Sequence, residues 1–517
     1  MGPEMASSAM TVAALIFSLF SLSNSINTFP LSSHYRSIGR PSPPFPSSLI
    51  KPELLKPTIS YSSEKVYYEI KYFTQTLDHF NYVPWGYETF QQRYLINSKY
   101  WGGPIDKAPI FVYTGNEGDV EWFAQNTGFM FENAPYFKAL LVFIEHRYYG
   151  ESIPYGSEEI AYKNASTHGY LSSAQALADY AMLIIDLKKN LSAEDSPVVV
   201  MGGSYGGMLA TWFRLKYPHV CIGALASSAP ILNFADITSP YSFNNIVTED
   251  FRSESENCYK VIKNSWQKIH ETAQQPGGLE ELRKSFRICP NYISEDSLTN
   301  WLERAFIYTA MTDYPVPSSF LAPLPAFPIE QMCKAVDDAG DEQFKGIYEA
   351  ANIFYNYTGD SMCFNLSDNS DRHGLNGWGF QACTEMLLAT GGRTQESIFP
   401  PYTYNYTQTQ EYCQQSYGIN PRPHWITTHF GGHDIKRVLK RFGSNIIFFN
   451  GLRDPWSGGG VLENLSDSIV ALVAKEGAHH IDLRFSTEGD PMWLSEVRKR
   501  EIHILSMWLE QYYKDIA

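Results

Sequence analysis

Short apolar runs and amphipathic stretches alternate along the chain from about Val66 onward. The runs are rich in β-branched and aromatic residues, which predicts buried strands. The stretch from Ser172 to Asn190 repeats apolar residues at helical spacing, with Ser172 or Ser173 as the expected N-cap. This alternation predicts a mostly parallel, doubly wound sheet with helices on both faces. The expected strands in this part are Ile110–Thr114, Leu140–Glu145, Val198–Met201 and Ala224–Ser227.

The pattern changes between residues 232 and 425, where longer helical stretches replace the strand-like runs. Strand-like runs return at Asn445–Gly451 and Ser468–Gly477, and a terminal amphipathic helix is expected from Pro491. A sheet that is interrupted by helices and then resumed is typical of an α/β-hydrolase fold with a large inserted cap. The expected division is a signal peptide (1–25), a leader or propeptide (26–65), a first core part (66–231), a helical cap (232–425) and a second core part (426–517).

The first residues are typical of a protein that enters the secretory pathway. The apolar stretch Met10–Leu22 is too short to span a bilayer comfortably, and small polar residues follow it, as in a signal peptide. Residues 26–65 are rich in Pro and Ser, which is typical of a leader without a packed core. Six Asn-x-Ser/Thr sequons predict N-glycosylation at Asn164, Asn190, Asn356, Asn365, Asn405 and Asn464.

Charge and composition exclude other classes of partner. The net charge is −15 and no basic run follows the pattern of a phosphate-binding surface, so we expect no nucleic acid partner. No later run approaches membrane-spanning length, so we expect no stable membrane anchor. An acidic surface loses self-repulsion at low pH, which is compatible with a vacuole or lysosome as well as with export from the cell.

The seven cysteines are distributed unevenly. Six lie between residues 258 and 413, which predicts that disulfides stabilise the cap. The seventh, Cys221, is expected to be a small buried hydrophobic residue. Because none of them forms a C-x-x-C pair, the sequence argues against zinc, and we expect no metal or cofactor.

The sequence SPVVVMGGSYGGML (196–209) contains a G-x-S-x-G motif, formed by Gly202, Ser204 and Gly206. It lies between a buried strand and a helix, where a nucleophile elbow exposes its serine above the sheet. Ser204 is therefore the candidate nucleophile. The backbone N–H of Tyr205 is the first expected donor to an oxyanion. The second should come from the loop 115–119, in which we favour Asn116.

A serine nucleophile needs a base and an acid that orients the base. In an α/β-hydrolase these follow later strands in the order acid, then histidine. Asp454 comes directly after the expected strand Ile446–Phe449, and His479 and His480 come after Ile469–Ala474. Spacing alone does not choose between the two histidines. The segment EHRYYG (145–150) is interpreted as a wall of the active site or, nearly as well, as a structural network.

Five ordered motifs carry a family resemblance: TGNEGD (114–119), EHRYYGES (145–152), GGSYGGM (202–208), DPWSGGG (454–460) and EGAHHIDLR (476–484). They resemble the family of lysosomal Pro-Xaa carboxypeptidase and dipeptidyl peptidase II, and the chain is more similar to the first branch. The resemblance implies a serine peptidase that cleaves after proline, with a triad of Ser204, Asp454 and His479. It also implies a proline pocket lined by Met208 and Trp456, and assistance to the triad from His480 and Arg484.

The resemblance further implies three disulfides, Cys258–Cys333, Cys289–Cys363 and Cys383–Cys413. A fourth pair of the family is missing, because Ser239-Pro240 and the stretch 389–392 lack its cysteines. We therefore expect the cap to be less rigid than in the family.

The chemistry of the substrate terminus leaves two exopeptidase activities open. Arg147 and Arg484 could bind a terminal carboxylate, whereas Glu117 and Asp119 could bind a terminal amine. We expect release of a C-terminal residue from peptides that end in Pro-Xaa. The alternatives are an aminopeptidase similar to dipeptidyl peptidase II and a secreted esterase or lipase. Peptides with penultimate proline are the expected partners, and a homodimer is an allowed assembly.

Overall fold

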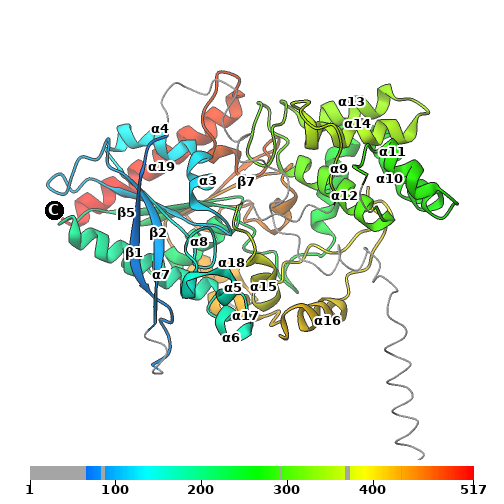
Figure 1. Ribbon diagram of the computed structural model, residues 1–517. Coiled ribbons are helices and arrows are strands. Elements are labelled where there is room, and N and C mark those ends of the chain that lie inside the picture. Colours follow the sequence, from blue (N-terminus) through cyan, green and yellow to red (C-terminus); the bar gives the residue numbers. More distant parts are fainter. Residues whose placement is uncertain (1–65, 83–87, 291–292, 367–372, 432) are drawn as a thin grey trace, which may run out of the picture.

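The computed structural model describes residues 66–82, 88–290, 293–366, 373–431 and 433–517 (Figure 1). The predicted signal peptide and leader lie outside the described residues. Within them the chain forms an eight-stranded sheet with the strand order β1-β2-β4-β3-β5-β6-β7-β8. The predicted α/β-hydrolase fold with a mostly parallel sheet is confirmed.

Six strands of the sheet are parallel, and the sequence pattern predicts all of them. They are β3 (Ile110–Thr114), β4 (Leu140–Ile144), β5 (Val198–Gly203), β6 (Gly223–Ser227), β7 (Ile446–Gly451) and β8 (Ile469–Ala474). Two further strands, β1 (Glu69–Thr76) and β2 (Thr89–Asn97), are antiparallel and are not among the strands expected from the sequence. β1 lies at the edge and is mostly exposed, so it lacks the continuous apolar run of the buried strands.

Helices cover both faces of the sheet because alternate strand residues point to opposite sides (Figure 1). Phe111 and Phe449 belong to the apolar cluster that also includes residues of α4 (Gly128–Phe137) and α19 (Met492–Asp515). Val112 and Phe448 belong to the cluster on the other face, together with residues of α7 (Ser173–Asn190), α8 (Tyr205–Lys216), α17 (Trp425–Phe430) and α18 (Ile435–Phe442). The side chain of Ser172 caps α7, as predicted.

Helices fill the chain between β6 and β7. α9 (Ser242–Glu254), α10 (Glu256–Ala273), α11 (Gly278–Ser285), α12 (Glu295–Met311), α13 (Pro328–Asp338) and α14 (Gln343–Asn356) gather at one side of the sheet, on the right in Figure 1. α15 (Trp378–Thr384) and α16 (Tyr406–Tyr417) follow, and α15 returns to the helices that flank the sheet. Glu385, which follows α15, accepts a hydrogen bond from the N–H of Ser173 at 2.6 Å. The insertion therefore has a distal part, α9–α14, and a part around α15 that packs on the core. The predicted domain boundaries stay a prediction.

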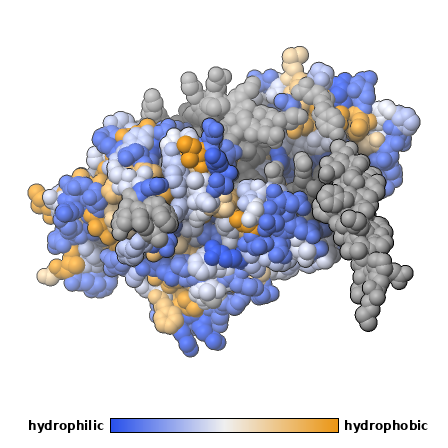
Figure 2. Space-filling view, turned by 60° about the horizontal axis from the view of Figure 1, so that its bottom comes forward, coloured by the Kyte–Doolittle hydropathy of each residue, from blue (hydrophilic) through white to orange (hydrophobic). Residues whose placement is uncertain are grey.

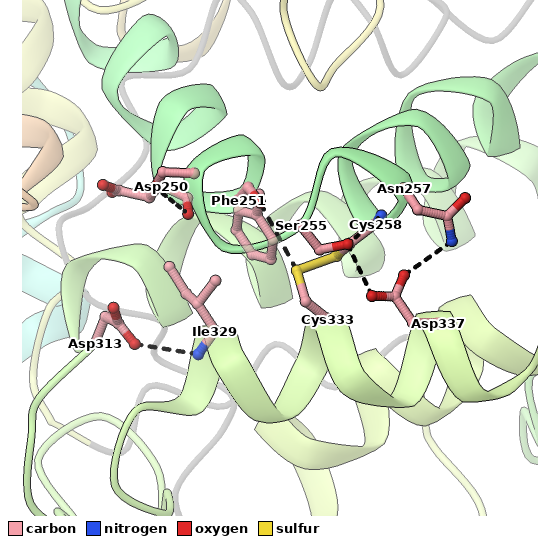
Figure 3. Close-up of a disulfide and its surroundings, with 10 residues drawn as sticks. Asp250, Phe251, Ser255, Asn257, Cys258, Asp313, Ile329, Cys333 and Asp337 are labelled. Carbon is pink, nitrogen blue, oxygen red and sulfur yellow. Dashed lines mark hydrogen bonds between the residues drawn. A yellow bond between two sulfur atoms is a disulfide. The ribbon is translucent and has the colours of Figure 1, made fainter.

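Three disulfides join cysteines of the described residues, and their pairs are Cys258–Cys333, Cys289–Cys363 and Cys383–Cys413. These are the pairs that the resemblance implies. Figure 3 shows the first of them between α10 and α13, where Asp337 also accepts hydrogen bonds from Ser255 and Asn257. Cys221 is a buried free thiol, as expected. Covalent links therefore reinforce the inserted segment, whereas packing holds the sheet.

The described surface carries most of the asparagines of the predicted sequons. On the face shown in Figure 2, hydrophobic residues form small groups among hydrophilic ones. Five sequon asparagines are exposed and Asn356 is half-buried, so glycosylation stays a prediction at each of them. None of the helices in the described ranges is long and apolar enough to span a bilayer.

Candidate active site

Ser204 occupies a strained turn between β5 and α8. Its backbone has φ 56° and ψ −127°, a conformation that L-residues rarely adopt. The N–H of Ser204 donates to the carbonyl of Ser227 on β6 at 2.9 Å, which holds the turn against the sheet. The backbone therefore forms the strand–turn–helix arrangement that a nucleophile elbow requires.

Glycines flank this turn because its neighbours approach too closely for a side chain. A Cβ at Gly206 would lie 2.3 Å from Oδ1 of Asn116 and 2.7 Å from the carbonyl oxygen of Thr114. A Cβ at Gly202 would lie 2.3 Å from the backbone of Gly206. Both motif glycines are thus required by steric contact with the scaffold.

Asp454 and His479 lie in contact at the carboxyl edge of the sheet. Nδ1 of His479 is 2.7 Å from Oδ2 of Asp454, and both side chains are fully buried. The other carboxylate oxygen of Asp454 accepts the N–H of Trp456 at 3.0 Å, which caps the short helix η4 (Pro455–Gly459). Nε2 of His479 has no hydrogen-bond partner among the described residues. A histidine that is held by a carboxylate through Nδ1 and has Nε2 free is arranged to act as a base.

The inserted segment contacts both loops that carry Asp454 and His479. The N–H of His479 donates to the carbonyl of Met311 at 3.0 Å, and the hydroxyl of Tyr314 donates to the carbonyl of His479 at 2.8 Å. Asp313 forms an ion pair of 2.7 Å with Arg453, the residue before Asp454. Met311 at the end of α12 and the two residues Asp313 and Tyr314 that follow the helix therefore position the acid and the base relative to each other.

His480 is placed beside His479 but has different contacts. The two rings have centroids 4.1 Å apart, and Arg484 donates through Nη2 to Nδ1 of His480 at 2.6 Å. Burial, the neighbouring His479 and the charge of Arg484 hold the pKa of His480 well below its ordinary value. His480 is therefore neutral, and because its Nδ1 accepts a hydrogen bond, its proton is on Nε2. The structure thus separates the two histidines that spacing could not.

Two nitrogen atoms of the Arg484 side chain have no hydrogen-bond acceptor among the described residues. Its guanidinium lies 4.1 Å from the centre of the Phe320 ring, and its Nε and Nη1 atoms are buried with no hydrogen-bond partner among the described residues. Buried N–H groups without an acceptor are costly, so an anionic ligand within reach would be stabilised.

The nucleophile helix is connected to the insertion through the side chain of Tyr205. Burial lowers the pKa of His146 to about 4, so the ring is neutral, and its Nδ1–H donates to the carbonyl of Arg147. The Tyr205 hydroxyl therefore donates to Nε2 of His146 at 3.0 Å and accepts from Nε2 of Gln381 at 2.6 Å. Gln381 belongs to α15, so the insertion helps to hold the residue whose backbone N–H is the expected oxyanion donor.

The loop after β3 packs directly against the elbow. Nδ2 of Asn116 donates to the carbonyl of Gly203 at 2.7 Å, and Oδ1 of Asn116 accepts from Tyr113. The side chain of Asn116 is therefore part of the scaffold, and an oxyanion role would use its backbone N–H. This role stays a prediction.

Two charged candidates are corrected by their contacts. The side chain of Arg147 uses all five N–H groups on Asp179 and on the backbone carbonyls of residues 76, 77 and 170, so it has no donor for a substrate. Oδ1 of Asp119 caps α3 (Val120–Gln125) and accepts from Arg93, so the charge that an amine would need is already paired with a guanidinium. Glu145 also pairs with Arg93. The segment 145–150 thus forms the structural network that was the second interpretation.

Glu117 is fully buried, and neither carboxylate oxygen has a hydrogen-bond partner of good geometry among the described residues. Burial raises its pKa to about 8, against smaller opposite effects of its backbone and of the Asn116 amide. Glu117 is therefore uncharged in acid.

Met208 and Trp456 are 1% and 6% exposed and belong to different apolar clusters, so the proline pocket that they are expected to line stays a prediction.

Sequence reasoning missed the residues that hold the site from outside the motifs. Asp313, Tyr314 and Gln381 lie in the inserted segment, far from the motifs in sequence. Single polar residues in a helical segment carry no spacing signal, and only the fold shows what they contact.

Comparison with known proteins agrees with this geometry. The family model described as serine carboxypeptidase S28 matches residues 75–501. The chain is 42% identical to the lysosomal Pro-X carboxypeptidase of Homo sapiens over 453 residues, which cover 86% of this chain and 89% of that protein. It is 36% identical to the prolyl carboxy peptidase like protein 5 of Caenorhabditis elegans over 446 residues, or 82% and 86% of the two chains. The resemblance that the motifs carry is confirmed, and the chain belongs to the serine carboxypeptidase S28 family.

Proposed function

We propose that this protein is a serine carboxypeptidase that releases the C-terminal residue from peptides ending in Pro-Xaa. The observation that carries the proposal is the buried Asp454–His479 pair, together with the strained Ser204 turn, and we propose that Ser204 and His479 meet in the active site. Relatives named for Pro-X carboxypeptidase activity align with most of the chain, which supports proline as the residue before the cleaved bond.

In the proposed mechanism, Nε2 of His479 takes the proton from Oγ of Ser204 as that oxygen attacks the carbonyl carbon of proline. Asp454 keeps the proton of His479 on Nδ1 and stabilises the imidazolium that forms. The N–H groups of Tyr205 and of the Asn116 backbone receive the oxyanion. His479 then donates its proton to the departing nitrogen of the last residue. Water releases the peptide from Ser204 by the same steps in reverse.

The charges around the site favour a terminal carboxylate over a terminal amine as the recognised group. Nε and Nη1 of Arg484 have no acceptor among the described residues, and a carboxylate would supply one. An amine would need an anion, but Asp119 is bound to Arg93 and Glu117 is uncharged in acid. These contacts support the carboxypeptidase over an activity similar to dipeptidyl peptidase II.

Trp456 and Met208 are proposed to bind the proline ring, which offers few polar atoms and is selected by apolar contact. Trp456 packs edge-on against Phe243 of α9, with ring centres 4.8 Å apart, so the insertion supports this wall. We place the protein in the secretory pathway, with a vacuole or lysosome or the cell exterior as its destination. The apolar N-terminal stretch and the lysosomal relatives support this location.

The test uses Ala-Pro-Phe with each end either free or blocked, and mass spectrometry of the products. A carboxypeptidase releases Phe from the free peptide and from its N-acetyl form but not from its C-terminal amide. Release of Ala-Pro from the amide, with no cleavage of the N-acetyl form, would instead identify a dipeptidyl peptidase. Hydrolysis of p-nitrophenyl esters without cleavage of any of these peptides would identify an esterase. Ser204→Ala is the control for contaminating peptidases.

A further inference from the structure

Asp236, His424 and His433 lie close together on the surface. None of them is next to a residue of the proposed triad in the sequence. One ligand atom from each of them lies within 4.8 Å of the other two. The two imidazole rings have centroids 5.1 Å apart. Among the described residues, no side chain or backbone group forms a hydrogen bond or ion pair with the three ligand-bearing side chains. Three potential metal ligands thus lie close together without hydrogen-bond partners among the described residues.

The three residues lie near the two ends of the chain between β6 and β7, and His433 lies just beyond the predicted end of the insertion at residue 425. Asp236 follows β6, where the chain enters the insertion, and has φ 65°. His424 lies directly before α17 and His433 lies shortly before α18, where the chain returns to the sheet. Asp236 and His433 line a surface pocket of about 790 Å³, to which Gly458 and Gly460 also contribute.

We propose that Asp236, His424 and His433 bind one Zn²⁺ ion, with water as a fourth ligand. Two imidazoles and one carboxylate are a ligand set that zinc accepts, and hard cations such as Ca²⁺ prefer oxygen alone. Zinc binds such ligands at about 2.0–2.1 Å, which puts ligand atoms of a tetrahedral site about 3.3 Å apart. Because all three side chains are exposed, they can close this difference by small rotations.

This site differs from the C-x-x-C zinc motifs, which the sequence lacks. Those motifs consist of closely spaced cysteines, whereas these ligands lie far apart in the chain and are brought together by the fold. A bound ion would join the entry of the insertion to its exit. It would also stiffen the wall that contains Gly458 and Gly460, next to the loop of Asp454.

The test is calorimetric titration of the full chain with Zn²⁺, together with its melting temperature with and without the ion. The variants are Asp236→Asn and the double variant His424→Ala/His433→Ala. His219→Ala removes an exposed histidine elsewhere and is the matched control. Circular dichroism checks the fold of each, and all four sites are at the surface, so folding should be preserved.

We expect one zinc ion per wild-type and His219→Ala chain, and a higher melting temperature with zinc for both. The double variant should bind at least tenfold more weakly and lose the thermal shift, and Asp236→Asn should be intermediate. Mg²⁺ and Ca²⁺ should not compete. Zinc binding that is equally tight in the double variant and in His219→Ala would overturn the proposal, because the ion would then be held elsewhere, for example by the buried His479 and His480. Absence of zinc binding by the wild-type chain would overturn it as well.

Discussion

The hydroxyl of Tyr314 donates a 2.8 Å hydrogen bond to the backbone carbonyl of His479. Tyr314 belongs to the inserted segment and His479 to the loop after β8, so one bond couples the cap to the proposed catalytic base. The N–H of the same histidine donates to the carbonyl of Met311. Both backbone groups of His479 are therefore held by the insertion, whereas its ring is held by Asp454 on the sheet.

Tyr314→Phe should lower kcat/KM by about two- to tenfold, because the loss of one neutral hydrogen bond costs about 0.5–1.5 kcal/mol and loosens the imidazole. Steady-state kinetics on a Pro-Xaa peptide measures this change. Tyr355→Phe is the matched control, since that hydroxyl donates to the carbonyl of Trp301 within the insertion at the same 2.8 Å. Equal activity losses in the two variants would mean that the effect is general destabilisation of the insertion.

Asp454→Asn should lower kcat by about 10⁴-fold while the protein stays folded, because the amide no longer fixes the proton of His479 on Nδ1. Single-turnover cleavage measures the loss. Asp337→Asn is the control, since this carboxylate accepts two hydrogen bonds far along the insertion (Figure 3) and should retain near wild-type kcat. A loss below tenfold in Asp454→Asn would contradict its role as the orienting acid.

Gly206→Ala should both destabilise the protein and reduce its activity. The new Cβ would lie 2.3 Å from Oδ1 of Asn116, so the hydrogen bond from Asn116 to Gly203 must break or the elbow must move. Such overpacking costs about 1–3 kcal/mol. Thermal unfolding and fluorophosphonate labelling measure the two effects. Gly489→Ala is the control. Its new Cβ would lie 3.3 Å from Cγ1 of Val316, a contact that small side-chain movements relieve, so its stability and labelling should match those of the wild type.

The parts of this molecule that the sequence predicts are those with a local pattern. Buried parallel strands such as Val198–Gly203 are continuous apolar runs, and the elbow needs glycines next to its serine. The acid and histidine follow such strands directly. In contrast, β1 is an exposed edge strand with a weak pattern, and the burial of Arg147 by five acceptors depends on distant segments. Charge and motif position alone made Arg147 a candidate for the substrate, and only its contacts exclude it.

Arg484→Gln should raise KM for a Pro-Xaa peptide with a free C-terminus by about tenfold or more, because a charge-assisted hydrogen bond to the carboxylate is worth about 1.5–3 kcal/mol. The same variant should change hydrolysis of a neutral p-nitrophenyl ester much less. Comparison of KM and kcat on the two substrates separates substrate binding from an effect through His480, which would lower kcat on both. Arg500→Gln removes an exposed arginine on α19 and is the control.

Glu117 should contribute less to the stability of the protein as the pH rises. Its pKa is about 8 in the folded protein against an ordinary value of 4.5, so the folded state binds more protons between these two values. The contribution of Glu117 to stability must therefore decrease from about pH 4.5 to pH 8 and be constant below that window. Glu117→Gln mimics the protonated form, so its melting temperature should rise relative to that of the wild type between pH 5 and pH 8, as measured by calorimetry at one scan rate. Glu488→Gln, at an exposed site, should have the same pH dependence of the melting temperature as the wild type. Parallel pH dependences of the wild type and Glu117→Gln would show that Glu117 is ionised throughout this range in the folded protein.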